Sequence, residues 1–333
     1  MVVIEKAVLH VLDIDAAAAV YSDSLLPLED GAKDFLIKHI EKTMNSQEAK
    51  NGVFYEDSVF QSQLMEYKRG NIDFISLSVD TAKKLQTMLS QSAELKPADF
   101  IMCQVRIEDR SMLVIFKCNS HQGFVHQIYQ TETGFGTQLA NHYAILPGMT
   151  QKIDEFAYID LEKLDIKVKS RKYTIDGSSV LLLPELLLEC APAPSPAETI
   201  KKVQQVVRKV AEDFGQDQVA AAAAVKTFIA ENAEKMSAID PNEAGKEVFR
   251  DSTSMQEAYS KELNSKGPVE PVKVDKEATL KKMSRHKLST DTGIELTIPT
   301  DYFENTEYIE FSQNDDGSYS ITLKHIQNII NKS

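Results

Sequence analysis

The first 190 residues mix helical and strand-like hydrophobic patterns. Residues 2–12, VVIEKAVLHVL, form an apolar run rich in β-branched residues, which predicts a strand. Residues 31–44 instead repeat their apolar positions every third or fourth residue, which predicts a helix with one buried face. A second helix is predicted over residues 81–95, with Asp80 as its N-cap.

A series of β-type runs follows these helices. Residues 100–107 and 112–118 are separated by a short connection, which predicts an antiparallel hairpin. Residues 123–129 are expected to continue the meander, and residues 156–161 and 166–175 to add further strands. Because no crossover helix separates these runs, we expect an antiparallel sheet with helices, a fold of the α+β class.

Residues 196–263 have the pattern of a helical segment. Ser195-Pro196-Ala197-Glu198 is a capping box with proline at the first helical position, a strong signal for a helix start. A second helix contains the alanine run at 220–224, where small side chains are typical of close helix packing. A third helix is predicted from a cap at Asp240 through Tyr259.

The last 60 or so residues (273–333) are predicted to form a small α+β domain. A helix capped by Asp275 is expected to continue to about Lys287. Residues 293–299 predict a strand, and residues 308–326 a hairpin that turns at Asn314-Asp315-Asp316-Gly317.

Two segments rich in proline separate these parts, APAPSPA at 191–197 and NSKGPVEPV at 264–272. Proline donates no backbone hydrogen bond, so such segments favour extended connectors. We therefore expect a domain over 1–190, a helical segment over 196–263 and a domain over 273–333. The middle helices need a partner for their apolar faces, so we expect these parts to pack together.

The composition is that of a globular chain. Hydrophobic residues make up 42% of the 333 residues, but no stretch of about 18 apolar residues occurs, so we expect no membrane span. The amino terminus lacks the features of a signal peptide, which predicts a cytoplasmic location. Three cysteines without paired spacing, Cys103, Cys118 and Cys190, fit reduced thiols in that compartment.

The sequence carries no motif of a known catalytic site. Gly134-Phe135-Gly136 is an isolated fragment of a dinucleotide loop, without the third glycine or the strand before it. Cys118, His121, His126 and His142 are near one another in sequence but match no standard zinc spacing. We therefore expect no catalytic residue, no metal, no cofactor and no enzymatic activity.

The net charge of −13 opposes DNA binding, because phosphate contact requires a local excess of cations. One candidate for such an excess lies in the strand predicted over 166–175. Alternation would place Lys167, Lys169, Arg171 and Tyr173 on one face, a basic stripe that ends in an aromatic ring. The alternative is an edge strand whose lysines prevent aggregation.

A second cluster of cations lies near the carboxyl terminus, opposed only by Asp275 and Glu277. Cations at the carboxyl end of a helix interact favourably with the helix dipole. This interaction alone could explain the cations from Arg285 to Lys287. Structure does not require so many cations in fifteen residues, so a nucleic-acid contact is the competing interpretation. The cluster comprises Lys273, Lys276, Lys281, Lys282, Arg285, His286 and Lys287.

Several segments resemble the bacterial nucleoid-associated proteins of the NdpA (YejK) type. The resemblance covers nearly the whole chain in the order and length of its elements, and its motifs are structural. It implies nucleoid localisation, association with double-stranded DNA and no enzymatic activity, and it identifies no DNA-contact residue. The segments are VVIEKAVLHVL, DSLLP, NGVFYEDSVF, NIDFISLS, GIELTIPTDYFENTEYIEF and DDGSYSITLKHI.

Two hypotheses for function follow. The first is a nucleoid protein that contacts duplex DNA through local basic patches, with tolerance of sequence because those patches are poor in base-reading side chains. The second is an acidic interaction factor recruited to the nucleoid by DNA-bound partner proteins. A two-fold homodimer would double each basic patch, and we expect one.

Overall fold

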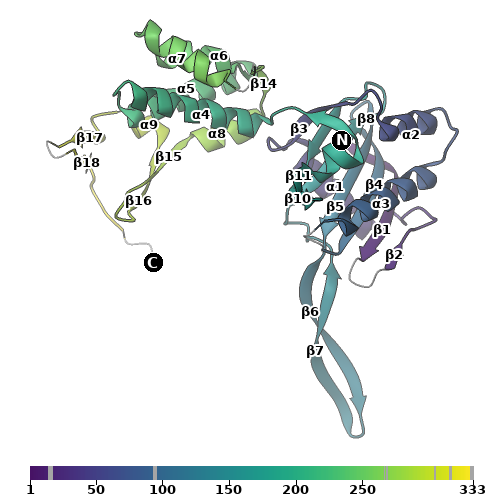
Figure 1. Ribbon diagram of the computed structural model, residues 1–333. Helices are drawn as coiled ribbons and strands as arrows, with labels where there is room; N and C mark the ends of the chain where they lie inside the picture. Colours follow the sequence, from purple (N-terminus) through teal and green to yellow (C-terminus); the bar gives the residue numbers. More distant parts are fainter. Residues whose placement is uncertain are drawn as a thin grey trace. The chain divides into compact units, whose positions relative to one another are not determined.

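The computed structural model describes residues 1–13, 18–92, 96–265, 267, 269–303, 305–314 and 317–330. Its contacts divide the chain into two compact units, unit 1 (Met1–Pro194) and unit 2 (Ser195–Ser333), which are described one at a time (Figure 1). Three predicted features lie partly outside the described residues. They are the end of the helix at 93–95, part of the second connector at 266 and 268, and the turn at 315–316.

Unit 1 is built on an eight-stranded sheet in which all strand pairs are antiparallel, as predicted. The strand order is β12-β3-β9-β8-β5-β4-β1-β2. The expected hairpin is present as β4–β5 in the middle of the sheet. The strands are β1 (Val2–Asp13), β2 (Ala18–Val20), β3 (Lys50–Phe54), β4 (Ala98–Ile107), β5 (Arg110–Asn119), β8 (Glu155–Asp160), β9 (Ile166–Lys169) and β12 (Cys190–Pro192).

Each face of this sheet has its own apolar core. Successive residues of β4 point to opposite faces, so that Phe100 and Met102 join one core while Ile101 and Cys103 join the other. The helices α2 and α3 and a π-helical turn, η1, contribute to the first core, and α1 contributes to the second. These elements are α1 (Asp30–Met44), α2 (Val59–Lys68), α3 (Phe74–Ser90) and η1 (Leu182–Leu187).

The helix predicted over residues 81–95 is α3, which begins earlier than predicted. The N-cap is Asp73, whose carboxylate accepts a hydrogen bond of 2.8 Å from the backbone N–H of Ser76. Asp80 lies inside the helix. Both residues have the side chain that a cap requires, and burial of Phe74 and Leu77 in the core decides between them.

The residues expected to continue the meander leave the sheet instead. The strand β6 (His121–Thr131) pairs with β7 (Gly134–Ile145), a strand that the sequence pattern did not predict. Together they form a long two-stranded ribbon that projects from unit 1 (Figure 1). Gly134 and Gly136 lie at the tip of this ribbon, which accounts for the isolated glycine motif.

The single strand expected over 166–175 is also two strands. After β9 the chain turns at Ser170 and Arg171, and β10 (Lys172–Ile175) then pairs with β11 (Ser178–Leu181) in a separate small sheet. The first proline-rich connector is shorter than predicted, because β12 includes Ala191 and Pro192 and pairs with β3. Since β12 is an edge strand, it tolerates a proline.

A buried ion pair connects the sheet of unit 1 to β10. The Lys117 ammonium lies 2.7 Å from the Glu155 carboxylate, and both side chains are almost fully buried. Lys117 Nζ also donates to the Asn119 side chain at 2.6 Å and to the Tyr173 hydroxyl at 2.8 Å. The Tyr173 hydroxyl in turn donates to Glu155 at 2.6 Å. All three ammonium protons therefore have acceptors.

Unit 2 is mainly helical and ends in short β-hairpins. The capping box predicted at Ser195 is present, with reciprocal hydrogen bonds of 3.2 and 2.9 Å between Ser195 and Glu198. The helices are α4 (Pro196–Asp213), α5 (Gln218–Met236), α6 (Pro241–Val248), α7 (Thr253–Leu263), α8 (Lys276–Met283) and α9 (Thr300–Phe303). The strands are β13 (Ala238–Ile239), β14 (Val272–Lys273), β15 (Arg285–Ser289), β16 (Glu295–Pro299), β17 (Ile309–Gln313) and β18 (Tyr319–Leu323).

The third helix predicted for the middle segment is two helices, α6 and α7. Ser252 caps α7, and its side chain accepts from the backbone N–H of Met255. Tyr259 packs back onto α6, where its hydroxyl donates to the carbonyl of Pro241 at 2.8 Å. A Cβ at Gly245 would collide with the Tyr259 ring, so glycine is what permits this close packing.

The helix capped by Asp275 is present as α8, but it ends at Met283 and not near Lys287. Residues 285–289 form β15, which pairs with β16. Met283 and Val274 belong to the same apolar core as α4, α5 and α7. The division of this part of the chain into a helical segment over 196–263 and a small domain over 273–333 stays a prediction.

Among the described residues, no helix has both the length and the apolar character needed to cross a membrane. Cys103, Cys118 and Cys190 are all buried and unbonded to one another, and burial raises the pKa of each thiol to about 12.

Replacing Lys117 with methionine is expected to destabilise unit 1 by about 3–5 kcal/mol, because the Glu155 carboxylate would remain buried without its cation. The double variant Lys117→Met/Glu155→Gln should recover part of this loss, since it removes both charges. Urea unfolding followed by far-UV circular dichroism measures both effects. Lys163→Met, at an exposed lysine, is the control and should change stability by less than about 0.5 kcal/mol. A Lys117→Met variant as stable as this control would contradict the prediction.

Candidate nucleic-acid interface

The six lysine and arginine side chains of the predicted carboxyl-terminal cluster are all exposed. Lys273 lies on β14, Lys276, Lys281 and Lys282 lie on α8, and Arg285 and Lys287 lie on β15. Within the part of the chain that the structure describes, none of the six forms an ion pair. Their charges therefore face solvent without a carboxylate partner.

The spacing within this cluster differs from the helical spacing expected. Arg285 was predicted to lie one helical turn after Lys281, but the helix ends before Arg285. On β15 the side chains alternate, so Arg285 and Lys287 share an exposed face while His286 points into the interior. The cations of the cluster therefore come from both a helix and a strand.

Two further cations lie beside Arg285, and the sequence pattern did not identify them. Lys226 on α5 donates to the backbone carbonyl of Arg285 at 2.9 Å. Burial lowers the pKa of Lys226, and the nearby positive charge of Arg208 on α4 lowers it further. Gln204, one turn before Arg208, donates to the Met283 sulfur at 3.9 Å, which links α4 to the end of α8.

We call these eight residues the basic surface. Its members come from five elements whose contacts lie within unit 2, since α5 packs on α8, α8 packs on β15, and α4 packs on α5 and β14. Arg208 and Lys226 are 77 and 59 positions before Arg285 in the chain, so only the fold brings them together. The members are Lys273, Lys276, Lys281, Lys282, Arg285, Lys287, Arg208 and Lys226.

His286 supports this surface from inside. Its ring stacks on Phe303 with 3.8 Å between centroids and an angle of 14° between planes. Its Nε2 is buried and has no hydrogen-bond partner among the described residues. Burial lowers the pKa of His286 to about 4, with smaller contributions from the charges of Lys226 and Arg208. The imidazole is therefore neutral at pH 7.

The predicted basic stripe of unit 1 does not form one face. Lys167 donates to the carbonyl of Met44 at 2.6 Å, and Lys169 lies 2.6 Å from the Glu48 carboxylate. Arg171 pairs with Asp154. Tyr173, on β10, is buried in the Lys117–Glu155 network, because the turn at Ser170 and Arg171 interrupts the alternation of β9. Contact of these residues with DNA stays a prediction.

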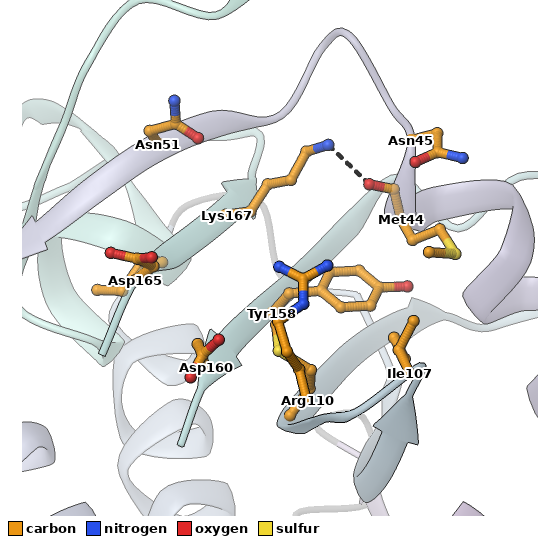
Figure 2. Close-up of a pocket in the computed structure, with 11 residues that line it drawn as sticks. Met44, Asn45, Asn51, Ile107, Arg110, Tyr158, Asp160, Asp165 and Lys167 are labelled. Atoms are coloured by element: carbon orange, nitrogen blue, oxygen red, sulfur yellow. Dashed lines mark hydrogen bonds between the residues drawn. The ribbon is translucent and has the colours of Figure 1, made fainter. Parts of the chain in front are cut away.

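A cleft of about 280 Å³ lies beside Lys167 in unit 1. Figure 2 shows Arg110 and Lys167 at this cleft, together with Asp160 and Asp165. The Asp160 carboxylate also accepts hydrogen bonds from the backbone N–H groups of Glu162 and Lys163, at 2.8 and 2.9 Å. Two cations and two carboxylates balance each other here, so the cleft has no excess of positive charge for a phosphate.

The residues weighed as metal ligands do not gather. Cys118 is buried on β5, whereas His121, His126 and His142 are exposed on the ribbon. The described ranges contain no group of three or more histidine, cysteine or carboxylate side chains placed to hold a metal ion.

Comparison with known proteins gives one match that spans both units. The family model described as nucleoid-associated protein YejK matches residues 8–331. No curated protein matches the chain significantly.

The neutral His286 predicts that unit 2 loses stability in mild acid. Between its folded pKa of about 4 and the ordinary value of 6.5, the unfolded chain binds a proton that the folded chain does not. Stability should therefore fall as pH drops from about 6.5 to about 4, by up to about 3 kcal/mol from this group.

His286→Phe keeps the stack on Phe303 and removes the titrating group. The free energy of unfolding of wild type minus that of the variant should decrease from about pH 7.5 to about pH 4.5 in urea titrations. The exposed His325→Asn is the control, and the pH dependence for His286→Phe should exceed that for this control. Equal pH dependence of the two variants would show that the His286 imidazole does not control acid stability.

Proposed function

The chain belongs to the family of nucleoid-associated protein YejK, and from that premise we propose that it contacts duplex DNA directly through the basic surface of unit 2. The observation that carries the proposal is the exposure of six cations that have no carboxylate partner among the described residues. In this proposal the protein is a non-enzymatic component of the nucleoid in the cytoplasm.

The local charge of the basic surface favours phosphate binding, although the net charge of the whole chain is −13. Charges separated by more than about 10 Å are largely screened at physiological salt, so a phosphate responds mainly to the nearest side chains. Each neutralised phosphate releases about one counterion, and an adjacent carboxylate would cancel that gain. Exposed cations without carboxylate partners meet this condition, whereas Lys169 and Arg171 in unit 1 already have carboxylate partners.

The composition of the basic surface favours binding without sequence preference. Residues 273–287 contain no asparagine or glutamine, which are the side chains that read adenine in the major groove. Lysines and arginines that reach phosphates fix position on the duplex but carry no sequence information. We therefore expect similar affinity for duplexes of unrelated sequence.

A second candidate function is recruitment to the nucleoid through DNA-bound partner proteins. The net charge favours it, because an acidic surface is complementary to basic nucleoid proteins. The two candidates differ in one measurable property, the affinity of the purified protein for bare duplex DNA.

The variant Lys281→Ala/Lys282→Ala/Arg285→Ala tests direct contact. It should weaken binding to all duplexes by roughly tenfold or more, and it should flatten the slope of log affinity against log salt by up to about three. Fluorescence anisotropy with two duplexes of unrelated sequence, across a salt series, measures both effects. The fold should persist, because these positions are exposed and Arg285 binds Lys226 through its backbone only.

Two matched variants complete this test. Lys235→Ala/Lys246→Ala removes two exposed lysines that pair with Glu231 and Glu243, and it should leave the salt slope unchanged. Lys167→Ala/Lys169→Ala/Arg171→Ala should change the slope less than the triple variant in unit 2, since carboxylates already offset part of that charge. If neither triple variant changes affinity or slope, recruitment by a partner protein is the better explanation.

A further inference from the structure

The β6–β7 ribbon of unit 1 exposes an apolar stripe. In its register Phe124 pairs with Asn141, His126 with Leu139, Ile128 with Thr137, and Gln130 with Phe135. Paired residues point to the same face, so one face carries four large apolar side chains. These side chains are exposed to 67%, 76%, 64% and 79% in the order Phe124, Leu139, Ile128 and Phe135. We call them the apolar stripe.

The opposite face of the ribbon is less exposed, with Val125 at 40% and Tyr129 at 49%. The Tyr129 ring lies across Gly136, where a Cβ would collide with it. In the neighbouring cross-strand pair, the Gln138 side chain donates a hydrogen bond of 3.0 Å to the Gln127 side chain. The apolar stripe has no such cover, and a two-stranded ribbon is marginally stable in water without packing on one face. A partner for the stripe would stabilise the ribbon.

The charge of the ribbon limits which partner fits. Residues 121–145 contain a single charged side chain, Glu132, and neither lysine nor arginine. Without lysine or arginine the ribbon lacks the charges that supply most of the affinity for duplex DNA, so nucleic acid is a poor partner for it. Two copies of an acidic chain repel each other. This electrostatic repulsion is smallest where the uncharged surface of one copy approaches that of the other.

The stripe is also self-complementary. From the base of the ribbon to its tip, the order of side chains is aromatic, aliphatic, aliphatic, aromatic. This order is the same from either end. A two-fold axis across the middle of the ribbon would therefore bring Phe124 of one copy beside Phe135 of the other, and Leu139 beside Ile128. Aromatic side chains then meet aromatic ones, and aliphatic side chains meet aliphatic ones.

The area of the stripe matches a small specific interface. Four side chains of roughly 150–200 Å² each, exposed as given above, leave about 500 Å² per copy. Covering two stripes would bury about 1,000 Å², near the lower limit for a specific association. We propose that the apolar stripe is the interface of a two-fold homodimer, in which the ribbons of two copies pack face to face. This inference does not depend on DNA contact by unit 2.

The full-length chain in the absence of DNA provides the test. Sedimentation velocity of wild type at tens of micromolar is expected to give twice the chain mass of 37.3 kDa. Ile128→Thr/Leu139→Thr places β-branched residues, which favour strands, at both positions but removes the apolar centre of the stripe, and it should weaken dimerisation at least tenfold. Val125→Thr/Gln127→Thr, on the opposite face, is the matched control and should sediment as wild type does. A monomeric wild type, or equal dimerisation by the stripe variant, would overturn the proposal.

A cross-linking experiment tests the same geometry without depending on the stripe variant. Phe124→Cys and Phe135→Cys chains are mixed and oxidised, and the native cysteines do not interfere because all three are buried. The two-fold arrangement predicts more disulfide between unlike chains than between like chains. Equal amounts of like and unlike pairs would reject this arrangement of the ribbons.

Discussion

The fold of unit 1 depends on how it accommodates one lysine in the buried stretch of a central strand. Lys117 lies on β5 in the middle of the sheet, and moving its charge out of water would be prohibitive without compensation. Compensation comes from Glu155 on the neighbouring strand and from Tyr173 on β10. Glu155 also accepts hydrogen bonds from the Ser170 hydroxyl and the Arg171 N–H, at 3.2 and 3.3 Å. The chain therefore turns where this carboxylate holds it, which is why the strand over 166–175 breaks.

The turn held by Glu155 also explains why the cations of unit 1 and those of unit 2 have different surroundings. The turn at Ser170 directs Tyr173 inward and leaves Arg171 beside Asp154, so that Arg171, like Lys169, pairs with a nearby carboxylate. In unit 2 the cations lie on elements whose interior is apolar, with Met283 and His286 buried beneath them. Nothing in that interior requires a charge, and the cations remain on the outside. The difference lies in what each group of cations packs against.

Local signals in the sequence were sufficient for several elements. The capping box at Ser195, the cap at Asp275 and the β4–β5 hairpin are all determined by neighbouring residues, and the sequence predicted each one. The choice between Asp73 and Asp80 was different, because both can cap a helix and only burial of the helix face distinguishes them. For the candidate site, the exposed cations of 273–287 were predicted, but Arg208 and Lys226 were not. Packing of α4 and α5 brings Lys226 onto the Arg285 carbonyl and Arg208 close to Lys226 and His286, which no local pattern encodes.

The position of β12 in the chain has a consequence for synthesis. This strand is the last element of unit 1, yet it forms the edge of the sheet beside β3, whose residues are about 140 positions earlier. The buried turn η1 immediately precedes it and covers one apolar core. A nascent chain that has emerged only as far as β10 has an open sheet edge and an uncovered core, both of which attract other unfolded chains. We therefore expect unit 1 to be most prone to aggregation before nearly 200 residues have left the ribosome, when β12 and η1 can complete the sheet and cover its core.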